Sequence, residues 1–411
     1  MVFDNLFDVK NKTNKDLIIT GCDMRFLIAM DSFKGCLSSH DAGYAVAEGV
    51  KRIFTDAEIV VCPISDGGEG MINALESVDN ARKMYCCVDD PYRKPVHVKY
   101  LIFPGNVAMI EMAQAAGINL SPQRDPLHAS TYGVGMMIRD AIDNGCRQFI
   151  IGIGGSATND GGAGMLQALG FRLLDNDGNA IERGAIGLKS LAYIDDLNVI
   201  PELADCIFHV ACDVTTPLLG NHGCSSVFGP QKGATPQNVY DMEQWLSHYV
   251  DIVKSSHPDA NPDSPGSGAA GGLGFALNVF CHAELKPGLP LIASILHLEE
   301  KIQAADYIIT GEGQIDAQTV MGKVPVGIAS IAKKYHKPVI ALTGAIGVEL
   351  HTIHSHGIDA VFAIQKGPCS LEDSMKSERT RNNLSDTAEQ IARLIRLSNG
   401  HHLIGNGISD D

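Results

Sequence analysis

The glycine-rich stretch GIGGSATNDGGAG, residues 152–164, restricts the possible folds more than any other part of the chain. An apolar run precedes it at 149–151 and another follows at 165–169, so the stretch is expected to join a strand to a helix. Its glycines, Gly154 and Gly155 among them, leave backbone N–H groups open to an approaching anion. The polar side chains between the glycines are Ser156, Thr158, Asn159 and Asp160. This combination predicts a phosphate or nucleotide site.

Two other interpretations of the stretch stay open. Gly152, Gly154 and Ala157 match the relaxed GxGxxA fingerprint of dinucleotide-binding folds, and Asp175 follows near the position of a ribose-binding carboxylate. Against this, polar residues and a second glycine pair delay the helix, and Asp175 opens a DNDG segment that is typical of a hairpin turn. The third interpretation is a glycine turn that binds nothing.

Composition narrows the class of protein. A chain of 411 residues exceeds one ordinary core and predicts two domains. Its net charge of -16 argues against nucleic acid as a partner, because a polyanion needs a basic face. Its 11 cysteines are scattered without a CxxC pair, which predicts a reduced, cytoplasmic protein. No apolar run is long enough to span a membrane, so no membrane-spanning helix is expected. The expected partners are small molecules, and the chain is expected to be a monomer or homodimer.

Apolar segments alternate with helical patterns at both ends of the chain. Residues 25–30 and 58–62 are expected to be buried parallel strands, separated by a helix that Ser38 caps. The alternation returns near the C-terminus, with strands expected at 306–310, 338–342 and 360–364. In the middle, the strands on either side of 104–106 are expected to form a hairpin, which breaks the alternation.

This pattern predicts an α/β fold with two α/β domains. A three-layer domain, Rossmann-like or flavodoxin-like, is expected from both chain ends, residues 24–85 and 289–400. A second, mixed α/β domain is expected to be inserted at 86–288. Residues 1–23 are expected to be an N-terminal extension, and residues 401–411 a flexible tail.

Candidate site residues follow the first two expected strands, at the carboxyl ends where α/β sheets bind ligands. Lys34 follows the first strand, and the second is followed by Asp66, Gly67, Gly68 and Glu69. The two glycines leave the carboxylate of Asp66 unobstructed, which favours a functional role. The alternatives are that Lys34 is simply solvated and that this segment is an ordinary helix entry.

Later strands are followed by similar candidates. Asp213 follows a strand expected at 206–211, where metal-binding carboxylates are common, although it could also be a turn residue. Lys232 lies between glycines just before a long helix and could meet a phosphate or a carboxylate. The strand at 306–310 is followed by Glu312, Asp316, Gln318 and Lys323. Residues 261–274, NPDSPGSGAAGGLG, are expected to be a linker or hinge, or a second substrate loop.

Taken together, these side chains are the components of phosphoryl transfer. The carboxylates of Asp66, Asp160, Asp213 and Asp316 could hold Mg²⁺ or orient a hydroxyl, and the lysines could bind phosphate oxygens. Many anion-binding proteins share this set. The chain lacks a Walker A motif, because its one GK pair, Gly322-Lys323, is not followed by Ser or Thr. A kinase activity would therefore need another fold.

Seven segments, in this order, resemble the type 1 glycerate kinase family of bacteria: MDSFKG, SDGGEG, IGIGGSATNDGGAG, ACDVTTPL, FGPQKGA, GAAGGLG, and TGEGQIDAQT with GKVP. The resemblance runs from about residue 24 to the closing helix. It implies two α/β domains, one inserted in the other, with the active site in the cleft between them. It also implies transfer of the γ-phosphoryl group of ATP to D-glycerate with Mg²⁺.

The resemblance suggests roles for individual residues. Asp66 or Asp213 would orient the glycerate hydroxyl or bind Mg²⁺, and Lys34 and Lys232 would neutralise phosphoryl charge. The family more often has arginine where this chain has Gln314, so Lys323 would be a substitute cation. The expected product is 2-phosphoglycerate, with 3-phosphoglycerate as the alternative. A hydroxy-acid dehydrogenase and a non-catalytic glycerate sensor are the other classes that stay open.

Overall fold

The computed structural model describes residues 24–65, 67–68, 70–76, 80–320, 323–347 and 350–398. The chain divides into two compact units, with the divisions between residues 65 and 66 and between residues 292 and 293. We call residues 66–292 the inserted unit and the described residues of 24–65 and 293–398 the terminal unit. The domain boundary expected between residues 85 and 86 lies inside a strand, and the domain assignment stays a prediction. The expected N-terminal extension and C-terminal tail lie outside the described residues.

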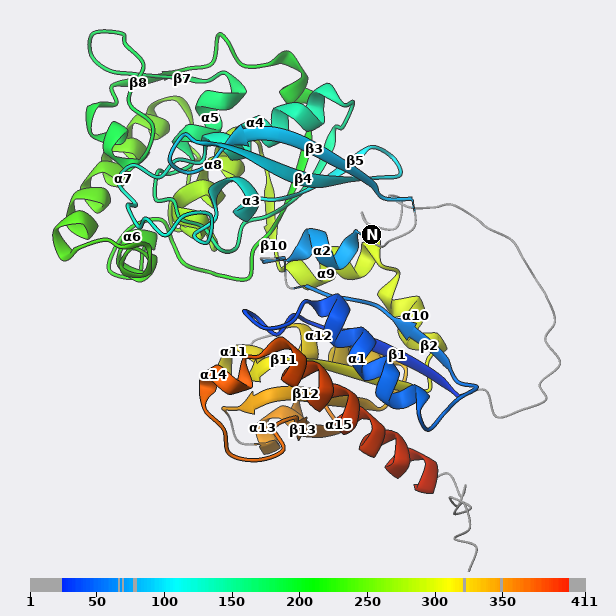
Figure 1. Cartoon of the computed structure of the whole chain (residues 1–411). Coiled ribbons are helices and arrows are strands. Elements are labelled where there is room, and N and C mark those ends of the chain that lie inside the picture. The colour runs from blue at the N-terminus through cyan, green and yellow to red at the C-terminus, as the bar shows by residue number, and fades with distance from the viewer. Residues whose placement is uncertain are drawn as a thin grey trace, which may run out of the picture. The chain divides into compact units, whose positions relative to one another are not determined.

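The terminal unit is built on one parallel sheet with the strand order β13-β12-β11-β1-β2 (Figure 1). Its strands are β1 (Arg25–Met30), β2 (Glu58–Val61), β11 (Tyr307–Ile315), β12 (Val339–Ile346) and β13 (Ala360–Ala363). Counted within the unit, this order is 2-1-3-4-5, the flavodoxin-like order, so the predicted fold class is confirmed. The order reverses between β1 and β11, and folds of this class bind ligands at the carboxyl ends of the strands at that point.

Helices cover both faces of this sheet. Alternate residues of β1, such as Phe26 and Ile28, belong to a core that includes Ala388 of α15 (Ser377–Ser398). Ser38 accepts a hydrogen bond from the backbone N–H of Asp41 (3.0 Å), so it caps the neighbouring helix α1 (Ser39–Lys51) as expected. The helices α10 and α12 contact β1 and β11. The remaining helices of this unit are α10 (Leu298–Ala304), α11 (Ala317–Val320), α12 (Val324–Lys334), α13 (Leu350–Ser355) and α14 (Leu371–Ser374).

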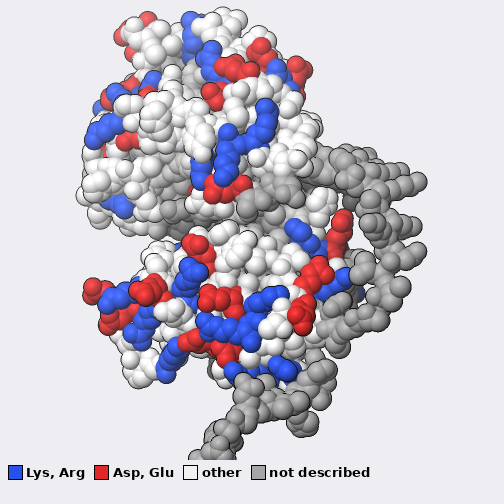
Figure 2. Space-filling model, turned by 45° about the vertical axis from the view of Figure 1, so that its right-hand side comes forward, with Lys and Arg blue, Asp and Glu red and all other residues white. Residues whose placement is uncertain are grey.

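Charges of both signs alternate on the molecular face that Figure 2 shows. On the surface of α1 and α15, Arg52 forms ion pairs with Glu48 (3.1 Å), Asp386 (3.2 Å) and Glu389 (3.2 Å). Exposed pairs of this kind stabilise a protein only weakly. Among the helices of the described residues, none combines the length and apolar character that crossing a membrane requires.

The inserted unit has a six-stranded mixed sheet with the order β10-β9-β6-β5-β4-β3. Its strands are β3 (Arg82–Asp89), β4 (Pro95–Phe103), β5 (Val107–Glu111), β6 (Gln148–Gly152), β9 (Ile207–Ala211) and β10 (Glu284–Lys286). The predicted hairpin is confirmed as the antiparallel pair β4 and β5. Strands β5, β6, β9 and β10 run parallel, and their last residues are in register: Glu111, Gly152, Ala211 and Lys286. Four loops therefore leave the sheet at the same level.

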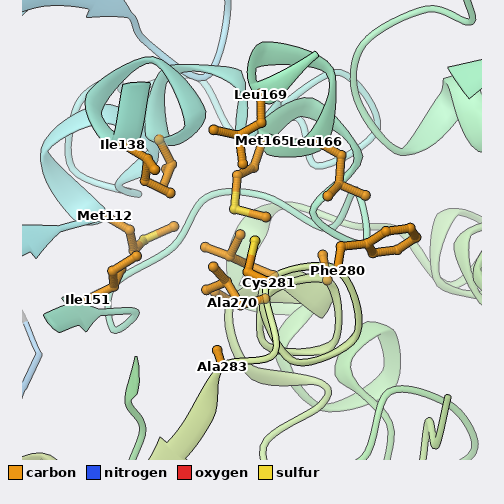
Figure 3. Close-up of a cluster of buried hydrophobic side chains, with 14 of the residues drawn as sticks. Met112, Ile138, Ile151, Met165, Leu166, Leu169, Ala270, Phe280, Cys281 and Ala283 are labelled. Carbon is orange, nitrogen blue, oxygen red and sulfur yellow. The ribbon is translucent and has the colours of Figure 1, made fainter. Parts of the chain in front are cut away.

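One apolar core holds the inserted unit together. Met112, which follows β5, and Ile151 of β6 belong to it with Ile138 of α4, Met165 of α5 and Phe280 of α8 (Figure 3). The helices of this unit are α2 (Met71–Leu75), α3 (Ala113–Ala116), α4 (Tyr132–Asp143), α5 (Ala163–Leu169), α6 (Cys224–Phe228), α7 (Pro236–Ser256) and α8 (Leu273–Phe280). A small hairpin adds β7 (Arg172–Leu174) and β8 (Tyr193–Asp195), and α9 (Gly288–Ile295) follows β10.

Candidate active site

The segment Gly67-Gly68 lies directly over the carboxyl ends of β6 and β9. Gly67 has a φ of +90°, and a Cβ there would lie 2.5 Å from the Cβ of Ala211. A Cβ on Gly152 would in turn lie 2.4 Å from the carbonyl oxygen of Gly67. Both positions therefore require glycine for close approach of two backbones. The neighbouring candidates Asp66 and Glu69 lie outside the described residues.

Glu111 holds this segment in place, although sequence reasoning did not select it. Its buried carboxylate accepts hydrogen bonds from the backbone N–H groups of Gly70 (2.8 Å) and Ile72 (3.1 Å) at the start of α2. The available signal was a single charge at the end of the apolar strand VAMIE, because such a charge is costly to bury without partners. Glu111 thus connects the glycine segment to the sheet.

Asp160 anchors the central loop from within. Its fully buried carboxylate accepts hydrogen bonds from the backbone N–H (2.8 Å) and the hydroxyl (3.0 Å) of Thr131, and from the backbone N–H groups of Gly162 (3.2 Å) and Gly164 (3.3 Å). Burial raises the pKa of Asp160, and these hydrogen bonds oppose that rise. The carboxylate therefore ties the loop to the starts of α4 and α5.

Lys232, which lies later in the chain, also holds the central loop in place. It ends a short 3₁₀ helix (Pro230–Lys232), and only 2% of it is exposed. Its ammonium group donates to the hydroxyl of Ser156 (2.9 Å) and to the carbonyl oxygen of Thr158 (2.6 Å). Burial lowers the pKa of Lys232 to about 8, with Cys224 and Asp160 opposing the change. The cation expected from the sequence is thus brought to the loop, but as an internal support.

The segment 266–276 forms the layer beneath the loop. It is buried throughout, and the carbonyl oxygen of Gly271 accepts a hydrogen bond from the backbone N–H of Gly161 (2.9 Å). A Cβ on Gly271 would lie 2.1 Å from the carbonyl oxygen of Thr158. Residues 266–274 of the linker or hinge expected at 261–274 are therefore not a flexible connection, because their glycines are needed for tight packing. Asn159, also fully buried, donates its amide to the hydroxyl of Ser225 (2.9 Å).

Gly154 and Gly155 are the part of the central loop that reaches solvent. Gly155 is exposed and Gly154 is half-buried, whereas Ser156, Thr158, Asn159 and Asp160 are all buried. Ligand contact at this loop would therefore use the backbone at 154–155. The four polar side chains shape and support that backbone.

The dinucleotide interpretation does not fit this geometry. The helix α5 begins at Ala163, well after Ala157, whose backbone N–H donates to the carbonyl oxygen of Ala116 (2.9 Å). The carboxylate of Asp175 accepts from the backbone N–H groups of Asp177 (3.0 Å) and Asn179 (2.8 Å) inside its own turn. Neither the tight strand-to-helix turn nor the ribose-binding carboxylate is formed. The hairpin interpretation of DNDG is confirmed.

Asp213 lies at the same sheet edge, immediately after β9. One of its carboxylate oxygens accepts a hydrogen bond from the backbone N–H of Gly288 (3.0 Å), the first residue of α9. The residue is exposed, so its carboxylate is open to solvent at this edge. Among the described residues, no three His, Cys, Asp or Glu side chains are grouped so as to hold a metal ion.

A second cluster lies at the switch point of the terminal unit. Glu312 of β11 is 6% exposed and accepts a hydrogen bond from the hydroxyl of Thr319 (2.5 Å). Burial raises the pKa of Glu312, with Asp316 adding to the rise and Thr319, Lys323 and Lys34 opposing it. The four predicted residues Lys34, Glu312, Asp316 and Lys323 are therefore brought close together.

The flanking residues of this cluster differ in exposure. Lys34 follows β1 and is exposed, and Lys323, which caps α12, is half-buried. Asp316 accepts a hydrogen bond from the backbone N–H of Thr319 (3.4 Å) and caps α11. The side chain of Gln318 lies outside what the structure describes. Thr319, like Glu111, was not selected from the sequence, because its hydroxyl becomes informative only when its partners are known.

Comparisons with known proteins identify the family of the chain. The model of the glycerate kinase family matches residues 26–396. The chain is 44% identical over 357 residues to the glycerate 2-kinase of Escherichia coli strain K12, which covers 86% of this chain and 93% of that protein. It is 43% identical over 384 residues to the glycerate kinase of Bacillus subtilis strain 168, which covers 93% and 100%.

The chain is also similar to a solved structure of a related protein. A crystal structure of a protein assigned as glycerate kinase 2, from Salmonella typhimurium LT2, superposes with a TM-score of 0.81 at 43% identity. It covers 92% of this chain and 99% of that chain. The resemblance carried by the seven motifs is therefore confirmed: the chain belongs to the glycerate kinase family.

Proposed function

We propose that the protein transfers the γ-phosphoryl group of ATP to the C2 hydroxyl of D-glycerate, giving 2-phosphoglycerate. The observation that carries this proposal is the match along 93% of the Escherichia coli protein that is named glycerate 2-kinase. The family match over residues 26–396 includes every candidate site residue of this chain. Use of ATP follows from membership in a kinase family.

In the inserted unit, we assign anion binding to the backbone of Gly154 and Gly155. Backbone N–H groups of a glycine loop after a parallel strand bind phosphate or carboxylate oxygens well. Lys232 and Asp160 support this backbone from inside, and Lys232 also places a positive charge beneath it. Gly67 and Gly68 approach the same strand ends and complete the binding backbone. This assignment replaces direct contact between the Lys232 ammonium and the phosphoryl group.

In the terminal unit, we assign phosphate binding to the cations Lys34 and Lys323. Both act on Glu312 electrostatically and lie at the switch point of a flavodoxin-like sheet, the position where such sheets bind ligands. Lysines neutralise the charge that a phosphoryl group carries during transfer. Glu312 and Asp316 then orient polar groups of the bound substrate, and Gln318 contributes a side-chain amide.

Mg²⁺ is proposed to bind together with ATP. Magnesium in kinases is held by one or two carboxylates plus substrate phosphates, so the missing three-residue group among the described residues does not conflict with it. Asp213 fits this use, because its exposed carboxylate lies at the ligand edge of the sheet with one oxygen held by Gly288. Asp66 is the second carboxylate proposed. When bound, the ion neutralises charge on the phosphates.

The test is an assay of ATP consumption with D-glycerate and Mg²⁺, followed by phosphorus NMR of the product. Coupling to the C2 proton is expected and would identify 2-phosphoglycerate, whereas coupling to C3 protons would identify 3-phosphoglycerate. Asp66→Ala and Asp213→Ala should each reduce turnover about 100-fold or more without loss of folding. A folded protein that binds glycerate but leaves ATP intact would contradict the proposal. Light scattering would test the expected monomer or homodimer.

A further inference from the structure

The hydroxyl of Thr319 joins two acidic residues of the terminal unit. Thr319 is fully buried in α11. Its hydroxyl accepts a hydrogen bond from the backbone N–H of Asp316 (3.0 Å) and donates one to the carboxylate of Glu312 (2.5 Å). A hydroxyl has one proton to donate. That proton is therefore directed to Glu312 by the neighbouring N–H group.

The direction of the hydrogen bond between Thr319 and Glu312 is fixed. Because the backbone N–H of Asp316 occupies an acceptor position of the hydroxyl, the Thr319 proton points away from it and toward Glu312 Oε1. An ionised Glu312 accepts that proton more strongly than the neutral acid does, because hydrogen bonds to a charged acceptor are stronger. The geometry thus favours the ionised form of Glu312 and holds its side chain in one orientation.

The surroundings of Glu312 make this orientation relevant to chemistry. Lys34 approaches from the loop after β1, Lys323 from the start of α12, and Asp316 from the end of β11. The two cations favour the ionised carboxylate and Asp316 disfavours it. A Cβ on Gly313 of β11 would lie 3.7 Å from the backbone nitrogen of Lys34, so β11 and the loop after β1 are in contact here.

We propose that Thr319 is a positioning residue of the kinase reaction, which holds Glu312 as an oriented carboxylate beside the two proposed phosphate-binding lysines. This inference rests on the proposed function. It assigns Thr319 no contact with substrate, since its hydroxyl is fully buried and donates its one proton to Glu312. Its effect on catalysis passes through the orientation and the charge of Glu312.

Two other threonines at the same end of the sheet provide matched controls. Thr310 of β11 is fully buried, and its hydroxyl has no hydrogen-bond partner within the described residues. Thr343 of β12 is also buried, but its hydroxyl accepts from the backbone N–H of Ile315 (3.2 Å) and donates to the carbonyl oxygen of Ala345 (2.9 Å). Valine has nearly the same shape as threonine but lacks the hydroxyl. Each substitution therefore removes a hydroxyl with different hydrogen-bond partners and leaves the packing nearly unchanged.

The experiment measures kcat, KM and thermal unfolding of the full-length protein across pH 5 to 9 for Thr319→Val, Thr319→Ser, Thr310→Val and Thr343→Val. In Thr319→Val, we expect kcat to fall about 10- to 100-fold and the acidic limb of its pH profile to move upward by about one unit. Thr319→Ser should restore both. Thr310→Val should match the wild type, and Thr343→Val should lower the unfolding temperature without moving the limb.

Each outcome decides the inference. A folded Thr319→Val with an unmoved acidic limb overturns it, as does a loss of activity that matches the loss in Thr343→Val. If Thr319→Val does not fold, Thr319→Ser decides alone, since a moved limb in that variant also overturns it. Failure of the wild type to phosphorylate glycerate is a different result, which contradicts the proposed function. A carbon-13 NMR titration of the Glu312 carboxyl then still tests whether Thr319 lowers its pKa.

Discussion

Asp160 lies in the loop after β6 and Glu312 lies within β11, and these two buried carboxylates have different surroundings. Asp160 is fully buried and accepts four hydrogen bonds from residues of its own unit. Glu312 is slightly exposed and lies within electrostatic reach of two lysines at the switch point. One carboxylate anchors the backbone of a loop, and the other is proposed to face a bound ligand.

The lysines differ in the same way. Lys232 is buried and both of its known hydrogen bonds go to the central loop, whereas Lys34 is exposed at the end of β1. In the inserted unit, the buried charge of Lys232 stabilises the loop that is proposed to bind an anion through its backbone. In the terminal unit, the exposed charge of Lys34 is itself proposed to bind phosphate.

The largest effect is expected for Lys232→Met. The substitution removes a buried ammonium group and leaves Ser156 and Thr158 without their donor, so the loop backbone should shift. We expect kcat/KM to fall about 100- to 1,000-fold and the unfolding temperature to fall as well. Lys254→Met, at an exposed lysine of α7, is the control. Near wild-type kinetics in Lys232→Met would show that the protein does not need Lys232 to support the central loop.

The next effect is expected for Asp160→Asn. An amide has one acceptor oxygen and a second group that donates, so it cannot accept from all of the N–H groups around Asp160. We expect a loss of about 2 kcal/mol in the free energy of unfolding, measured by urea denaturation, with reduced kcat. Asp251→Asn in the exposed part of α7 should change neither. Unchanged stability would mean that the carboxylate is not a structural anchor.

A smaller loss of activity, without a loss of stability, is expected for Lys34→Met. A charge-assisted hydrogen bond to phosphate contributes about 1.5–3 kcal/mol, so kcat/KM should fall about 10- to 100-fold. Because Lys34 is exposed, the unfolding temperature should stay unchanged, in contrast to Lys232→Met. Lys334→Met, at an exposed lysine of α12, serves as the matched control. A large loss of stability in Lys34→Met would remove the distinction between the two lysines.

The last expected effect is a dependence of stability on alkaline pH. The pKa of Lys232 is lowered from 10.5 to about 8, so between these values the unfolded chain holds the proton and the folded protein does not. Stability from this group therefore rises with pH in that window, by at most about 1.4 kcal/mol per pH unit. The measurement is the difference in unfolding free energy between wild type and Lys232→Met from pH 8 to 10. A flat difference would show that Lys232 keeps its ordinary pKa.

The sequence alone located Lys34 and Asp316 after strands, whereas Glu312 lies inside β11, which is longer than expected and ends at Ile315. Lys34, Glu312, Asp316 and Lys323 were selected because polar residues after apolar runs lie at one edge of a parallel sheet, and the structure brings these four together. The α/β class followed from the same alternation of strands and helices, whereas the flavodoxin-like strand order came from the structure. Local patterns decide these features, since each strand carries its apolar run and its polar end within a few residues.

The sequence did not reveal which polar residues act inside the protein. Ser156, Asn159, Asp160 and Lys232 were all expected to grip a ligand, but their hydrogen bonds go to other parts of the inserted unit. Glu111 was missed for the same reason. A side chain's partners come from segments far away in the chain, and no pattern within one segment encodes them.

The glycine-rich segment 266–276 is the clearest case of this limit. Its composition is typical of a flexible linker, yet its glycines are packed against the central loop at distances that exclude a Cβ. Apolar periodicity and loop position were therefore determined by the sequence itself. Whether a glycine gives freedom or close packing, and whether a charge binds a ligand or supports a loop, was decided only by the tertiary structure, because burial and neighbours determine the cost of each group.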